Sequence, residues 1–198
     1  MDTWVWIVIA AAAVVALLLV FAFAARTRRR TALKERFGPE YDRTVETTGD
    51  RRRAETKLRE RQERYEELDV RDLTPAARDR YFDEWRIVQA RFVDDPASAV
   101  GDADRLVQQV MRERGYPVDD FDTRAEAISV DHPHLVEHYR AAHGVWGANE
   151  RGEATTEDLR QSLVHYRALF EELLGGDTDV ALSRDTDTPE RDEARTRR

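Results

Sequence analysis

The chain has 198 residues, of which 36% are charged, with no cysteine and a formal net charge of −8 at pH 7. Apolar residues are concentrated at the start, where they occupy 23 of the first 25 positions. Of the remaining 173 residues 71 are charged, well above the share of about 25% that is usual in globular domains. This composition excludes a large multidomain enzyme, and the lack of cysteine excludes disulfides, thiolate nucleophiles and Cys-ligated zinc.

The apolar run Trp4–Ala25 predicts a membrane anchor. As an α-helix, its 22 residues would extend about 33 Å, enough for a hydrocarbon core of about 30 Å. A lone segment in lipid must satisfy its own backbone hydrogen bonds, which only a helix does. The alternative is a cleaved secretory signal, because residues 22–24 resemble a cleavage site, but the run is too long and lacks a preceding basic residue. We therefore expect an uncleaved single-pass transmembrane helix within residues 1–25.

Basic residues follow the anchor directly and occur nowhere before it. Lys and Arg that flank a membrane span stay in the cytoplasm, so we expect the N-terminus outside and the C-terminal body in the cytoplasm, at the plasma membrane. The basic juxtamembrane segment, residues 26–49, also suits contact with anionic lipid headgroups. The four arginines nearest the anchor are the candidate headgroup ligands, namely Arg26, Arg28, Arg29 and Arg30.

The Lys and Arg residues within 26–36 form a basic collar, and two helices are predicted after it. Pro39 opens a short helix to about residue 47, and Asp50 can cap a second helix over residues 51–68. The second helix has a narrow coiled-coil-like stripe, in which Arg61 occupies a seam position. The apolar members of the stripe are Ala54, Leu58, Tyr65 and Leu68.

Four capped segments predict the remaining helices, while residues 116–121 are turn-like. The expected helices lie at 75–94, at 96–114, from Pro133 to a frayed end at Gly144–Gly152, and from Thr155 to about Leu174. No stretch alternates with period two. We therefore predict an all-α fold with one helical soluble domain over residues 50–174. The tail, residues 175–198, has too few apolar side chains to order itself and is expected to be disordered.

Large aromatic side chains recur at helical spacing within residues 75–94. Tyr81, Trp85 and Phe92 share one face, and rings at such spacing usually belong to a core because each one buries a large area. Two of these side chains, Trp85 and Phe92, are also candidates for contact with a partner, as is Trp146. The sequence leaves these two interpretations open.

A histidine cluster is the one pattern that resembles a catalytic site. His134, Glu137 and His138 form an H-x-x-E-H sequence, which on a helix would place two imidazoles one turn apart with a glutamate as general base for zinc-bound water. However, Pro133 places His134 in the first helical turn, and no clear third ligand is present. A histidine-metal hydrolase is therefore the alternative hypothesis, and no catalytic, metal or cofactor residue is assigned.

Other function classes lack their signatures. The chain has no phosphate-binding loop, dinucleotide fingerprint, nucleophile elbow or kinase motif. Beyond the anchor the net charge is negative, with 39 acidic and 32 basic residues, so nucleic-acid binding is not expected. The pattern favours a protein that is not an enzyme.

Four segments resemble recurring segments of a family of uncharacterised bacterial single-pass membrane proteins. They are Arg36–Arg43, Trp85–Pro96, Ser129–Pro133 and His165–Phe170. The resemblance extends over roughly residues 30–174 and implies a single-pass topology with a helical cytosolic domain. It assigns no activity and no site residue. Together with the anchor, it favours a membrane-tethered scaffold or adaptor that binds a protein partner or a second copy of itself at the cytosolic face.

Overall fold

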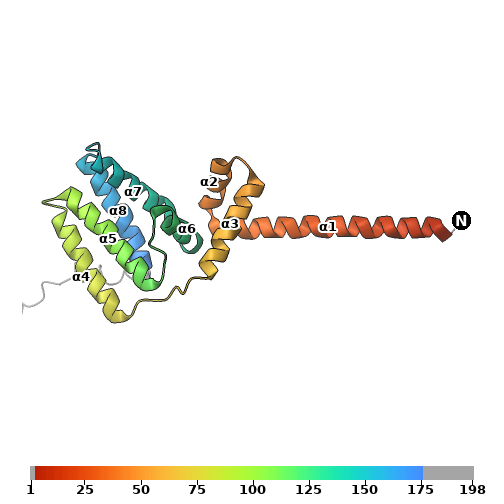
Figure 1. Ribbon diagram of the computed structural model, residues 1–198, viewed down its shortest axis with the longest axis horizontal. Coiled ribbons are helices and arrows are strands. Elements are labelled where there is room, and N and C mark those ends of the chain that lie inside the picture. The colour runs from red at the N-terminus through yellow and green to blue at the C-terminus, as the bar shows by residue number, and fades with distance from the viewer. Residues whose placement is uncertain (1–2, 176–198) are drawn as a thin grey trace, which may run out of the picture. The chain divides into compact units, whose positions relative to one another are not determined.

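The computed structural model describes residues 3–175, and within this range the side chains of residues 3, 5–15, 19, 22, 25, 26 and 29 lie outside the description. All regular structure in the described residues is α-helical (Figure 1), which confirms the predicted all-α class. The helices are α1 (Thr3–Phe37), α2 (Pro39–Thr48), α3 (Arg51–Glu66), α4 (Pro75–Arg91), α5 (Pro96–Arg114), α6 (Phe121–Asp131), α7 (Val136–Glu150) and α8 (Thr156–Leu173).

Helix α1 is a single 35-residue helix that joins the apolar run to the basic segment without interruption (Figure 1). It ends at Phe37 because Gly38 adopts a positive φ of 47° and Pro39 opens α2. Within the apolar run, the large apolar side chains that are described are exposed, and they are Trp4, Leu17, Leu18, Val20, Phe21 and Phe23. Among the described residues, no helix combines the length and the apolar character needed to cross a bilayer. Many side chains of the predicted anchor, Trp4–Ala25, fall outside the described set.

The chain divides into two compact units rather than one domain over residues 50–174. The first comprises residues up to Glu67 together with Ile128–His134, and the second comprises Leu68–Ala127 and the residues from Leu135 onward. Helix α3 therefore groups with α1 and α2. The predicted tail, residues 175–198, lies outside the described residues except for Gly175.

The first unit has a small core that joins α1, α2, α3 and the end of α6. Its buried members are Leu33, Phe37, Tyr41, Leu58 and Val130. The stripe predicted on residues 51–68 faces this core, since Ala54 and Leu58 are fully buried and Tyr65 packs against the cluster. The local sequence therefore identified the buried face of α3 correctly.

The second unit packs α5 against α4 and α8, and α8 against α7 (Figure 1). The aromatic stripe of α4 belongs to this core. Trp85 is only 3% exposed and stacks on Phe170 of α8, with ring centroids 4.7 Å apart. The suggestion that Trp85 contacts a partner is therefore wrong, because the indole is already covered by the protein's own α8.

The structure differs from the sequence-based expectation at two helices. Helix α6 was not predicted, yet Asp120 accepts the Thr123 backbone N–H at 2.9 Å in the manner of a helix cap. Helix α7 begins later than expected and continues through Gly144 and Gly147 to Glu150. Each glycine weakens a helix by about 1 kcal/mol, a cost that packing of this helix against α8 can offset.

Candidate functional site

The predicted H-x-x-E-H arrangement does not form on one helix. Helix α7 begins at Val136, so His134 precedes it and is exposed, whereas His138 lies within the helix. The expectation of a helix opening at Pro133 was wrong, and with it the i, i+4 relation between the two imidazoles disappears. Glu137, in the first turn of α7, forms an ion pair with Arg140 at 2.8 Å.

His138 pairs with a different histidine, namely His165 on α8. The two Nδ1 atoms are 2.7 Å apart, a hydrogen-bond distance at which one ring donates and the other accepts. Partial burial, together with the nearby His138, lowers the pKa of His165. This contact joins α7 to α8.

The other histidines have separate surroundings. His143 stacks on Phe121 with ring centroids 3.8 Å apart, and His132 lies 3.2 Å from the Asp131 carboxylate. Across residues 3–175, no three His, Asp or Glu side chains gather in a way that could hold a metal ion. Geometry therefore gives the hydrolase hypothesis no support from the described residues.

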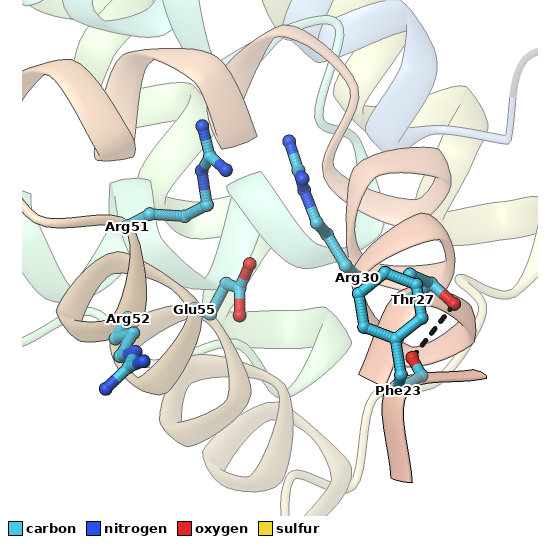
Figure 2. Close-up of a pocket in the computed structure, with 6 residues that line it drawn as sticks. All are labelled: Phe23, Thr27, Arg30, Arg51, Arg52 and Glu55. Atoms are coloured by element: carbon cyan, nitrogen blue, oxygen red, sulfur yellow. Dashed lines mark hydrogen bonds between the residues drawn. The ribbon is translucent and has the colours of Figure 1, made fainter. Parts of the chain in front are cut away.

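The basic collar leads to a pocket in the first unit. Figure 2 shows the side chains that line this pocket, which lies between α1 and α3. The pocket has a volume of about 340 Å³. Three lining residues come from α1 and three from α3, and they are Phe23, Thr27, Arg30, Arg51, Arg52 and Glu55. Arg30 is one of the four arginines that the sequence suggests as candidate headgroup ligands. Of the other collar arginines, Arg28 is exposed, and the side chains of Arg26 and Arg29 lie outside the described residues.

Arg51 and Arg52 were missed as site residues because a run of arginines at a helix start is typical of a solvated face. Only the packing of α3 against α1 brings them to the same pocket as Arg30. In Figure 2 the Arg30 and Arg51 guanidinium groups extend to the same side of the pocket, while Arg52 points away from them. Sequence separation hid this convergence, since about twenty residues and all of α2 lie between the two arginines.

The carboxylate that lines the pocket is engaged with a tyrosine. Tyr41 donates its hydroxyl hydrogen bond to Glu55 Oε1 at 3.0 Å, and both side chains are buried. Burial and the bond to Glu55 raise the pKa of Tyr41, while the Arg30 guanidinium opposes that rise. Glu40, which is 1% exposed, accepts a 2.8 Å hydrogen bond from Arg61, the arginine at the predicted seam position. The buried acids of this unit are therefore partnered.

A buried polar network holds the second unit together. Arg124 donates to the Tyr139 hydroxyl at 2.8 Å, and Tyr166 donates to Asp104 at 3.0 Å. Burial raises the pKa of Tyr139 to about 12 and also raises the pKa of Tyr166. Hydroxyls this hard to ionise do not act as bases near neutral pH, so the network fits a structural role.

Comparisons with protein-family models, with curated proteins and with solved structures found no match to this chain.

Proposed function

We propose that this protein is a single-pass, membrane-tethered helical scaffold or adaptor of the bacterial plasma membrane. The observation that carries the proposal is the unbroken apolar run Trp4–Ala25, which lies within the continuous helix α1. As a helix, the apolar run extends about 33 Å, which matches a hydrocarbon core of about 30 Å. The resemblance of residues 30–174 to bacterial single-pass membrane proteins points the same way.

The orientation follows from the basic collar. Arg28, Arg30 and Lys34 lie on α1 just past the apolar run, on the side expected to stay in the cytoplasm. The two helical units that follow would then face the cell interior. The exposed apolar side chains Phe21 and Phe23, 74% and 71% exposed, are those that lipid would cover.

A scaffold role agrees with the chemistry of the two units. The hydrogen bonds from Arg124 to Tyr139 and from Tyr166 to Asp104 fit a structural role, and no three His, Asp or Glu side chains gather in the described residues in a way that could hold a metal ion. A groove between α4 and α5 offers a surface for a protein partner, since Ile87 is 62% exposed beside Arg91 and Asp102. Ile87 thus replaces Trp85 as the contact candidate on α4.

Membrane insertion and orientation are tested in intact bacterial cells that express the full chain. We expect the chain to resist carbonate extraction and its C-terminal body to survive external protease. A chain released by carbonate, or digested from outside, contradicts the proposal. A variant that carries two arginines within residues 12–16 is the matched control, because charge in the apolar run should release the chain into the soluble fraction.

The adaptor role is tested by crosslinking in cells from a photoreactive residue at position 87. We expect crosslinks to one partner or to a second copy of this chain. The same probe at position 160, on the exposed surface of α8, is the control. Equal and diffuse labelling from both positions would contradict the proposal that the α4 surface around Ile87 contacts a partner.

A further inference from the structure

The basic pocket in the first unit has the composition of an anion site. Arginine side chains reach it from two helices, with Arg30 on α1 and Arg51 on α3 (Figure 2). Three arginines and one glutamate line it, so the formal lining charge is positive. Phe23 adds an aromatic ring at the side where α1 continues into the apolar run.

The pocket arginines are not consumed by internal ion pairs. In the described part of the first unit, the ion pairs include Lys34 with Asp42, Arg61 with Glu40 and His132 with Asp131, and none of these three uses a pocket arginine. Arg51 is exposed. The carboxylate of Glu55 is held by the Tyr41 hydroxyl at 3.0 Å. An incoming anion therefore meets the exposed Arg51 guanidinium and the Arg30 guanidinium, which also interacts with the Tyr41 hydroxyl, rather than a closed salt bridge.

Several polar groups near the pocket are already engaged. Asp50 accepts the backbone N–H groups of Arg52 and Arg53, at 2.7 and 3.1 Å, so these two backbone donors of α3 are occupied. Thr27 donates to the carbonyls of Phe23 and Ala24 within α1. The arginine guanidinium groups are suited to bind a phosphate in this pocket, because their planar, forked arrangement of N–H donors matches the phosphate oxygens.

The position of the pocket along α1 matches the depth of lipid phosphates. Arg30 follows the last apolar residue, Ala25, by five positions, which corresponds to about 7.5 Å along a helix. The polar region of a bilayer adds about 5–8 Å on each side of the hydrocarbon core. Phe23 would then lie near the boundary of the core, and the arginines at headgroup level.

We propose that this pocket is a discrete binding site for the phosphate of an anionic phospholipid headgroup, with Arg30 and Arg51 as the two guanidinium ligands. The inference rests on the proposed membrane anchor and deepens it, because it names a lipid class and adds a ligand from α3. A diffuse basic collar would attract anionic lipid through any of its arginines, whereas this site depends on two particular ones.

The test uses the full chain in neutral detergent micelles, with short-chain phosphatidylglycerol or phosphatidylcholine added and bound lipid counted by native mass spectrometry. We expect phosphatidylglycerol to bind at least tenfold more tightly than phosphatidylcholine. Arg51→Gln should weaken phosphatidylglycerol binding about tenfold, as expected for the loss of a charge-assisted contact. Arg53→Gln removes the same charge two residues away, outside the pocket lining, and should leave binding within twofold of the original.

The variants also separate binding from folding. Arg30 influences Tyr41, so Arg30→Gln could alter the core, whereas Arg51 is exposed and Arg51→Gln should keep the original circular dichroism spectrum. Equal binding by Arg51→Gln and the original chain overturns the site. So does equal weakening by Arg51→Gln and Arg53→Gln, which would mean a diffuse collar.

Two further experiments distinguish a lipid phosphate from a free phosphate ion, and the membrane-anchor proposal from the pocket proposal. Inorganic phosphate that binds the lipid-free chain with the same dependence on Arg51 would assign the pocket to a soluble anion and overturn the headgroup proposal. Flotation with pure phosphatidylcholine vesicles reports the anchor alone. A chain that does not float overturns both proposals, and one that floats without preferring phosphatidylglycerol in the micelle assay overturns only the pocket.

Discussion

Different interactions stabilise the interior of each of the two compact units. The first unit has a small apolar cluster and two buried carboxylates, Glu40 and Glu55, each paired with a side chain of another helix. The second unit has an aromatic core in which Trp85 stacks on Phe170, and its buried Arg124 is bound by the Tyr139 hydroxyl. The first unit therefore depends more on correct pairing of charges, and the second more on filled apolar volume.

Loss of apolar volume should damage the second unit most. Phe170→Ala removes the ring that stacks on Trp85 and meets Phe82 edge-on at 6.2 Å. We expect a loss of about 3–5 kcal/mol in unfolding free energy, measured by hydrogen exchange of peptides from each unit in the micelle-bound full chain. Val93→Ala, at a side chain that is 83% exposed, is the control and should change little. Equal destabilisation by both variants would contradict the assigned core.

Breaking the buried charge pair should damage the first unit nearly as much. Arg61→Ala leaves the Glu40 carboxylate buried without its 2.8 Å partner, and we expect the first unit to lose about 3 kcal/mol. Hydrogen exchange of α2 and α3 peptides measures the loss. In the double variant Glu40→Leu, Arg61→Met, most of the stability should return, because neither member of this buried pair remains charged. A double variant less stable than Arg61→Ala would show that the pair itself is strongly stabilising.

A glycine contact tests how tightly the second unit is packed. A Cβ at Gly101 on α5 would lie 2.8 Å from Cη2 of Trp146, so Gly101→Ala should cost about 1–3 kcal/mol through overpacking. Gly144, also in a helix interior, has open space around its Cβ position. Gly144→Ala should therefore stabilise α7 by about 0.5–1 kcal/mol. Urea unfolding followed by circular dichroism compares the two, and opposite signs are the expected result.

The smallest expected effect is a pH dependence within the second unit. The pKa of His165 is lowered by burial and by His138, so the unfolded chain binds this proton more readily than the folded one. Stability should therefore fall as the pH drops below the ordinary histidine value of about 6.5, and level off below the lowered folded pKa. His165→Gln should flatten this part of the profile. His134→Gln, at an exposed histidine, is the control, and equal flattening by both would exclude the pair as the source.

Helix boundaries were predictable where caps and prolines mark them locally. Asp50, Thr74 and Asp95 each accept backbone N–H groups at a helix start, as their sequence context indicated. Thr155, where the last helix is predicted to start, caps α8 and forms a reciprocal capping box with Asp158. Helix α6 was missed because its start has an Asp cap without a clear apolar stripe, and the sequence around Pro133 suggested a helix start that the structure places at Val136. Local signals thus identified seven of the eight described helices, including the region of α1.

Only part of the candidate pocket was visible in the sequence. Arg30 was expected to meet lipid because it follows an apolar run, a relation between neighbours in the chain. Arg51 carried no such signal, since its role depends on α2 turning the chain so that α3 packs on α1. The histidines show the reverse case, in which an apparent motif lost its geometry and His138 met His165 instead.

The sequence by itself determined the helical class, most helix ends and the buried face of α3, because backbone capping and apolar periodicity act over a few residues. Tertiary structure alone decided that α3 groups with α1 and α2, that Glu40 meets Arg61, and that Arg51 shares a pocket with Arg30. Those pairings join side chains distant in the sequence, and they depend on the packing of whole helices rather than on any local preference.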